Sequence, residues 1–95
     1  MSIGARFRLF VEENFSSISS FTYVIQISNG LLHKYFNDDT APGAGVLQKL
    51  YDLGCNINWL LSGHGEMWND TEAGRTLRDK HSKKTVTADD NRKKK

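Results

Sequence analysis

Hydrophobic residues recur every three or four positions through the first two thirds of the chain, which is the spacing of an amphipathic helix. The pattern predicts a first helix over residues 3–14, with these apolar positions on one face: Ile3, Phe7, Phe10 and Val11. Ser2 precedes this run and is the expected N-cap, since its hydroxyl can accept a hydrogen bond from the first turn.

Two short helices are expected next, separated by only about three residues. Ser17 can cap the first of them, whose expected apolar positions are Phe21, Val24 and Ile25. Ser28 can cap the second, over residues 29–37, with Leu32, Tyr35 and Phe36 facing inward. Two short helices joined this closely are typical of a helix-turn-helix motif.

Two further helices are expected after the turn-rich segment NDDTAPGAG. Pro42 is expected in the first turn of a fourth helix, which Gly54 can end in a left-handed conformation. Asn56 can cap a fifth helix that stops at Gly63. The predicted fold is therefore all-α, a bundle of five short helices within residues 1–68.

The composition changes at Asn69. From there to the end the large aliphatic residues are Leu77 and Val86, too few to offset the entropy of ordering the segment. Residues 69–95 are therefore expected to be a basic, disordered polar tail, with at most a nascent helix around residues 72–80. Residues 1–68 carry four basic and six acidic residues, a formal charge of −2, whereas residues 69–95 carry nine and five, a charge of +4.

Several classes of protein are disfavoured by the sequence. A single cysteine, Cys55, excludes a disulfide scaffold, and a buried structural thiol is expected there. His33, His64 and His81 lack the spacing of metal ligands, and no phosphate-binding glycine loop or catalytic triad is evident, so neither an enzyme nor a cofactor is expected. Because no apolar run approaches the length of a membrane span and no signal peptide is evident, a cytoplasmic protein is expected.

The segment LYDLGCNINWLLSGHGEMW, residues 50–68, resembles the end of lambda-repressor-like helix-turn-helix domains of the phage-repressor, Cro or XRE type. The specific part is Trp-Leu-Leu-x-Gly-x-Gly, which is residues 59–65 here. Upstream, SISSFTYVIQISNGLLHKYFNDDTAPGAGVLQKL is similar to the second, third and fourth helices of that family, so the resemblance covers about residues 3–68. The chain departs from the family at Gln26 and Asp38, where glycine is usual, and at Thr22, where alanine is common.

The resemblance implies a transcriptional regulator that binds double-stranded DNA, of the phage or prophage repressor or Cro type, in a bacterial or phage-infected cell. The helix after Ser28 would then enter the major groove with its N-terminal end leading. The positions expected to contact bases are Asn29, Gly30, Leu31, His33 and Lys34. An Asn side chain can pair with adenine and a Lys side chain with guanine. The alternative to base contact is that these residues form an ordinary solvated helix face.

Phosphate contacts are expected at the beginnings of the second, third and fourth helices and in the loop before the fourth. The positions are Ser17, Ser19, Ser28, Asn37, Thr40 and Gly43. Helix N-termini and hydroxyls suit phosphate, but the same serines serve equally as ordinary caps. Asp38 and Asp39 oppose such contacts because carboxylates repel phosphate. The lysine-rich end of the chain can add phosphate contacts that are independent of sequence, or simply aid solubility.

A homodimer on a pseudo-palindromic operator is the expected assembly, since related repressors pair through their last helix. The expected interface residues are Asn58, Leu61, Met67 and Trp68, although Met67 and Trp68 can instead cover the core of their own chain. A second hypothesis is a protein-interaction module on the same fold, such as an antitoxin or an anti-repressor, because the helical part is poor in basic residues.

Overall fold

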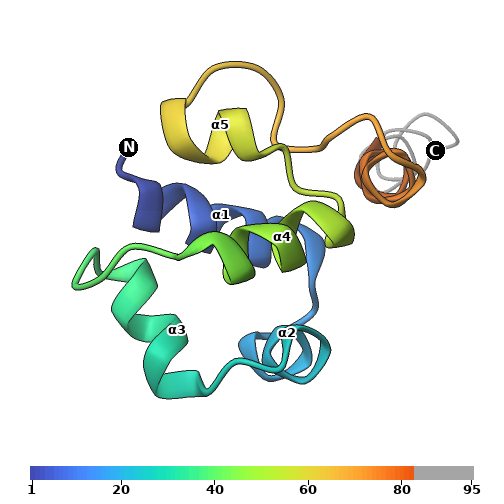
Figure 1. Ribbon diagram of the computed structural model, residues 1–95. Helices are drawn as coiled ribbons and strands as arrows, with labels where there is room; N and C mark the ends of the chain where they lie inside the picture. The colour runs from blue at the N-terminus through green and yellow to red at the C-terminus, as the bar shows by residue number, and fades with distance from the viewer. Residues whose placement is uncertain (83–95) are drawn as a thin grey trace, which may run out of the picture.

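The computed structural model describes residues 1–82, and within them the protein is all-α (Figure 1). The helices are α1 (Ile3–Asn14), α2 (Ile18–Ile25), α3 (Asn29–Phe36), α4 (Ala44–Leu53) and α5 (Ile57–Ser62). A further helix begins at residue 72 and continues to residue 82, the last described position.

Four helices begin at the caps that the sequence predicts. The hydroxyls of Ser2, Ser17 and Ser28 and the side-chain oxygen of Asn56 each accept a hydrogen bond from a backbone N–H in the first turn. Such caps satisfy donors that have no partner inside the helix. The predicted boundaries of α1, α3 and α5 are confirmed to within one residue, and α2 begins directly after its predicted cap.

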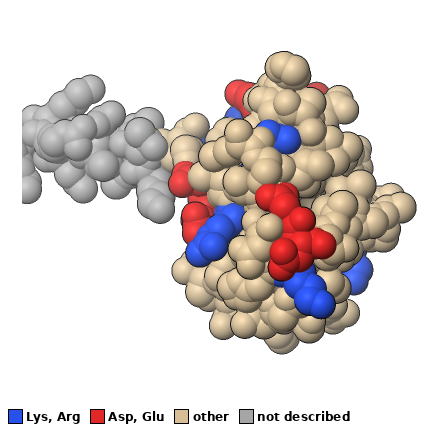
Figure 2. All heavy atoms as spheres, turned by 90° about the vertical axis from the view of Figure 1, so that its left-hand side faces the viewer, with Lys and Arg blue, Asp and Glu red and all other residues tan. Residues whose placement is uncertain are grey.

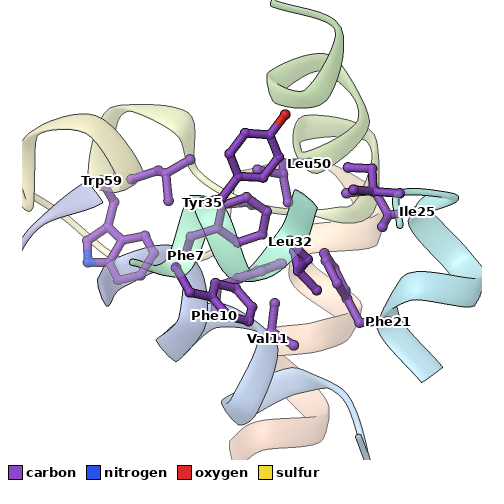
Figure 3. Packing of buried hydrophobic residues seen from close by; sticks show 13 residues of the cluster. Phe7, Phe10, Val11, Phe21, Ile25, Leu32, Tyr35, Leu50 and Trp59 are labelled. Carbon is purple, nitrogen blue, oxygen red and sulfur yellow. The ribbon is translucent and has the colours of Figure 1, made fainter. Parts of the chain in front are cut away.

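The core is centred on Phe7 of α1, whose side chain is completely buried. Its ring stacks on Tyr35 at 5.8 Å between centroids and meets Phe36 and Phe21 edge-on, at 5.5 and 6.0 Å. Figure 3 shows side chains from all five helices converging on this point, including Leu50 from α4 and Trp59 from α5. The expected inward positions of α3 are confirmed, and Trp59 is also buried in this core.

Helix α1 lies in the middle of the bundle and contacts α2, α3 and α5. In Figure 1, α2 and α3 occupy the lower side of the molecule and α5 the opposite side, with α1 and α4 between them. The bundle therefore holds α2 and α3 together on one side, away from α5.

Two local predictions are wrong. Val24 is 49 % exposed, because Ile18, Phe21 and Ile25 supply the inward stripe of α2 and Val24 lies beside it. Pro42 lies outside α4, which begins at Ala44 with Gly43 as its N-cap. The turn before the helix, rather than its first residue, accommodates the fixed backbone of this proline.

Residues 69–82, which the sequence assigns to a polar tail, are folded onto the bundle up to the last described residue. The Asn69 amide donates to the carbonyl oxygens of Tyr51 and Cys55, at 2.9 and 3.0 Å. Gly74 is buried against the turn at Gly54, where an added Cβ on Gly54 would lie 2.8 Å from the Gly74 Cα. Leu77 also packs against the core, and His81 lies 3.0 Å from Glu13 of α1, so the segment is held although it is poor in apolar side chains. Residues 83–95, the remainder of the expected tail, lie outside the described part of the chain.

Within residues 1–82, none of the helices has the length and apolar character that crossing a membrane demands. Acidic and basic side chains lie next to one another on the side of the molecule that faces left in Figure 1, and most of that surface is uncharged (Figure 2).

Candidate nucleic-acid interface

Helix α3 displays its polar residues because its opposite face is buried. Leu32, Tyr35 and Phe36 have exposed fractions of 6 % or less. The positions expected to contact bases are all exposed: Asn29, Gly30, Leu31, His33 and Lys34. One helix therefore presents hydrogen-bonding groups and an apolar side chain to solvent within its first six residues.

Two side chains on this surface have neighbours in the bundle. The His33 ring meets the Phe36 ring edge-on, 5.8 Å between centroids. The Arg8 guanidinium lies 5.7 Å from the centroid of the same Phe36 ring and is paired with Glu12 at 2.9 Å. Arg8 thus brings a positive charge from α1 to the end of α3. The position of Arg8 in the sequence does not predict its contact with Phe36, because that contact depends on how α1 crosses α3.

The positions expected to contact phosphate are exposed as well: Ser17, Ser19, Ser28, Asn37, Thr40 and Gly43. The hydroxyls of Ser17 and Ser28 accept from the backbone N–H groups of Ser20 and Leu31, at 3.0 and 3.2 Å. Both serines therefore act as caps. The Ser17 O–H donates to the Ser20 hydroxyl at 3.1 Å, whereas the Ser28 hydroxyl has an O–H that can donate to a phosphate oxygen.

Three serine hydroxyls gather at the beginning of α2. The Ser20 hydroxyl lies 3.0 Å from that of Ser16 and 3.1 Å from that of Ser17. These hydroxyls bond to one another and cap the first turn, so they place a polar cluster at the positive end of the helix dipole. The sequence indicated Ser17 and Ser19 here, whereas the contributions of Ser16 and Ser20 depend on the turn before α2.

Helix α4 begins without a side-chain cap, because Gly43 occupies the N-cap position. An added Cβ at Gly43 or Gly45 would meet nothing within 4 Å. Residues 43–45 are exposed, so this first turn lies at the surface.

Asp38 follows α3, yet its carboxylate is directed at α1. Its Oδ1 accepts from the Gly4 N–H at 2.8 Å, at the beginning of α1. Hydrogen bonds from the Ser2 side chain and the Gly4 N–H hold the pKa of the Asp38 carboxyl below its usual value. The negative charge of Asp38, which was expected to oppose phosphate binding, thus interacts with the positive end of α1.

The connection between α2 and α3 turns through a left-handed residue, Gln26, at φ 58°. Its N–H donates to the Thr22 carbonyl at 2.8 Å, and the Lys49 ammonium of α4 donates to the Ile25 carbonyl at 3.2 Å. Lys49 therefore joins the end of α2 to α4. The sequence did not predict this role, because Lys49 is a single lysine on an exposed face of its helix. Within residues 1–82, the non-glycine residues with positive φ are Gln26 and Asp38.

The residues expected at a dimer interface divide into two groups. Asn58 and Leu61 are exposed on α5, Leu61 by 47 %. Met67 and Trp68 are half-buried against the core of their own chain. The Asn14 side chain lies between them: its amide donates to the Met67 sulfur at 3.4 Å, and its oxygen accepts from the Trp68 indole at 2.8 Å.

Cys55 is completely buried, as expected for a structural thiol. Burial raises its pKa to about 12, so the reactive thiolate is not formed near neutral pH. Among the described residues, no three His, Cys, Asp or Glu side chains are grouped closely enough to hold a metal ion.

Comparisons with protein-family models, with curated proteins and with solved structures give no match to this chain.

Proposed function

We propose that this protein is a sequence-specific DNA-binding transcriptional regulator with a lambda-repressor-like fold, in which α2 and α3 form the helix-turn-helix and α3 enters the major groove. The observation that carries the proposal is the backbone at Gln26 and Asp38. At these two positions the chain lacks a glycine that is usual in the family, and both residues have the left-handed conformation that glycine favours. This agreement in backbone conformation supports the proposal.

The chemistry of the exposed surface supports the same proposal. Asn29 and Lys34 offer the donors and the acceptor that pair with adenine and guanine edges. The serines at the beginning of α2 and the open first turn of α4 suit the phosphates on either side. With so few basic residues near α3, each contact with a half-site is weak, and a homodimer on a pseudo-palindromic operator supplies the missing affinity and specificity.

In this proposal the two copies pair through α5. Asn58 and Leu61 lie on its exposed surface, whereas Met67 and Trp68 are half-buried against the core of their own chain. Such a protein would repress transcription by occupying promoter DNA, as a phage or prophage repressor or a Cro-like protein does.

The test is selection of bound sequences from a random duplex library, followed by gel-shift titration at moderate salt. The double variant Asn29→Ala and Lys34→Ala should lose the selected sequence. A matched double variant, Gln48→Ala and Lys80→Ala, removes an amide and a lysine from exposed positions elsewhere and should keep it. Recovery of no preferred sequence by the wild-type protein would contradict the proposal.

A second candidate function is a protein-interaction module, such as an antitoxin or an anti-repressor. Tyr23 and Val24 favour it, because they are 85 % and 49 % exposed on α2. Val24 also borders a shallow hollow of about 200 Å³ between α2 and α4. A stoichiometric protein partner that is retained by the Asn29→Ala, Lys34→Ala variant and lost by Tyr23→Ser would support this function over DNA binding.

A further inference from the structure

A hollow of about 230 Å³ lies between the end of α1 and the last described helix, residues 72–82, which is orange in Figure 1. None of the positions proposed to contact bases lines it. Its volume is below the roughly 300–1,000 Å³ of pockets that hold drug-sized ligands, which limits its occupant to a small molecule. The lining combines charged, aromatic and aliphatic side chains, among them Glu12, Glu13, Phe15, Leu77, Lys80 and His81.

The wall formed by α1 is negatively charged. The last turn of this helix carries Glu12 and Glu13 and no basic residue, although a helix is stabilised by positive charge at this end. Glu12 is paired with Arg8 through Oε2, and Glu13 bonds to His81 through Oε1. The two glutamate side chains are nevertheless 51 % and 43 % exposed, and a carboxylate accepts at about four positions. This wall therefore keeps acceptors for an ammonium group.

The wall formed by the last helix supplies the opposite charge and an apolar surface. Within residues 1–82 the Lys80 ammonium makes no ion pair or hydrogen bond, although it lines the same hollow as both glutamates. Leu77 precedes Lys80 by three residues, so the two lie on one face of their helix. Across from them, Phe15 is held in place by edge-on contacts with Phe10 and Phe21, at 6.1 and 5.0 Å between centroids. The hollow thus has an apolar part beside charges of both signs.

We infer that this hollow binds a free amino acid with an apolar side chain. The ammonium group of the ligand binds at Glu13 and the negative end of α1, and its carboxylate binds Lys80. The apolar side chain of the ligand packs on Phe15 and Leu77. A ligand with a single charge leaves either the glutamates or Lys80 without a counter-charge, so a zwitterion fits the lining better than a simple amine or a fatty acid.

A ligand in this position contacts both α1 and the last helix, so its binding stabilises the docking of residues 72–82. The site is therefore suited to sensing an amino acid through the attachment of this helix. The inference goes beyond the proposed function and does not depend on it, because none of its groups is needed to contact a base.

The probe is L-leucine, compared with two analogues that each lose one charge. Leucinamide keeps the ammonium group, and N-acetyl-leucine keeps the carboxylate. Two-dimensional NMR spectra of the full chain should show leucine shifting the amide resonances of residues 12–16 and 77–81. Each analogue should bind at least about tenfold more weakly, the scale of one lost charge-assisted hydrogen bond. Saturating leucine should also slow amide hydrogen exchange in residues 72–82.

Lys80→Met is the decisive variant, because within the described residues the Lys80 ammonium has no partner whose loss could disturb the fold. It should weaken leucine binding about tenfold or more and leave leucinamide binding unchanged, so that the two ligands become equal. Glu13→Gln should in the same way abolish the difference between leucine and N-acetyl-leucine. Lys34→Met removes an ammonium group from α3, outside the hollow, and should change neither comparison.

Absence of these resonance shifts at millimolar leucine would overturn the inference. Equal binding of leucine and leucinamide to the wild-type protein, or a Lys80→Met variant that still distinguishes them, would overturn it as well. None of these results bears on DNA binding, which the selection and gel-shift experiment tests separately.

Discussion

The Asp38 carboxylate accepts a hydrogen bond of 2.8 Å from the Gly4 backbone N–H, and this bond joins the end of α3 to the beginning of α1. Gly4 is buried at the same contact, where an added Cβ would clash with the carbonyl oxygens of Tyr35 and Phe36. The negative end of α3 thus faces the positive end of α1, with a carboxylate between them. The position of α3, the helix proposed to read DNA, is fixed at this contact.

This contact makes stability depend on pH in the acidic range. The folded-state pKa of Asp38 is lowered by the Ser2 side chain and the Gly4 N–H. A carboxyl with a lowered pKa contributes stability above its unfolded value of about 3.9, and the contribution is lost as the pH falls through the folded-state pKa. We expect urea denaturation between pH 6 and pH 2.5 to show a decline below about pH 4 that is smaller in Asp38→Asn.

The neighbouring residue supplies the control for this prediction. Asp39 is exposed and follows Asp38 directly, so Asp39→Asn removes the same charge from the same loop. Its acid decline should match that of the wild type. Equal profiles for Asp38→Asn and the wild type would show that the contact contributes nothing to the acid decline.

A second prediction concerns Arg6, which is 8 % exposed. Its guanidinium donates to the carbonyl oxygens of Leu60 and Leu61 at 2.8 and 3.1 Å, and also to that of Met1. These partners include the last carbonyls of α5, where a positive charge is favourable. Replacement by Met keeps much of the volume but leaves buried acceptors without donors, and should lower the free energy of unfolding by about 2–4 kcal/mol.

Arg8 is the matched control for Arg6, on the same helix. Its ion pair with Glu12 is half exposed, at 52 % and 51 % of the two side chains. Exposed pairs of this kind contribute roughly 0.3–0.5 kcal/mol, so Arg8→Met should cost far less than Arg6→Met in the same urea titration. Similar costs for the two variants would refute a special role for the buried guanidinium.

Structural features of this protein could be predicted from the sequence where the interacting residues are close together along the chain. Ser2, Ser17, Ser28 and Asn56 could be assigned as caps because each bonds within its own first turn. Two partners of Arg6, Leu60 and Leu61, are more than fifty residues away, and no local pattern indicates them. The hydrogen bonds of Asn69 were likewise not predicted from the sequence. Residues 69–82 were therefore assigned to a polar tail on composition alone.

In the candidate interface, too, local features could be predicted from the sequence and contacts between helices could not. The exposure of the expected base-reading positions could be deduced from the periodicity of α3, since the inward residues determine the outward ones. The contact of Arg8 with Phe36 and the hydrogen bond of Lys49 to α2 could not, because they depend on how helices cross. The left-handed backbone at Gln26 and Asp38 was not predicted, because neither residue type favours that conformation as glycine does.

The turn between α2 and α3 gives a third prediction. Gln26 adopts φ 58°, which costs a residue with a side chain roughly 1 kcal/mol relative to an extended or helical conformation. Gln26→Gly should therefore raise the free energy of unfolding by about 0.5–1 kcal/mol, measured by thermal or urea denaturation. Gln48→Gly, inside α4, should lower it by a similar amount, since there the backbone is helical. The same direction of change in both variants would contradict the argument.

A fourth prediction concerns Asn69, which fastens the last described helix to the bundle. Its amide donates to Tyr51 and Cys55, and its oxygen accepts from the Thr71 N–H at 3.2 Å. Asn69→Ala should lower the free energy of unfolding by about 2–3 kcal/mol and increase amide hydrogen exchange in residues 72–82 before the rest of the protein. Asn29→Ala, which removes an exposed amide from α3, should leave that exchange pattern unchanged.

The last prediction separates base contacts from phosphate contacts at the proposed DNA surface. Lys34 lies on the exposed side of α3, and if its ammonium pairs with guanine, Lys34→Ala should cost about 1–3 kcal/mol of binding free energy and relax the preference at one base pair. If it binds phosphate instead, the loss should be uniform across sequences, and the salt dependence should become shallower by about one unit of slope. Titrations of the selected duplex and of single-base variants at several salt concentrations distinguish the two results. Unchanged binding in every titration would remove Lys34 from the interface.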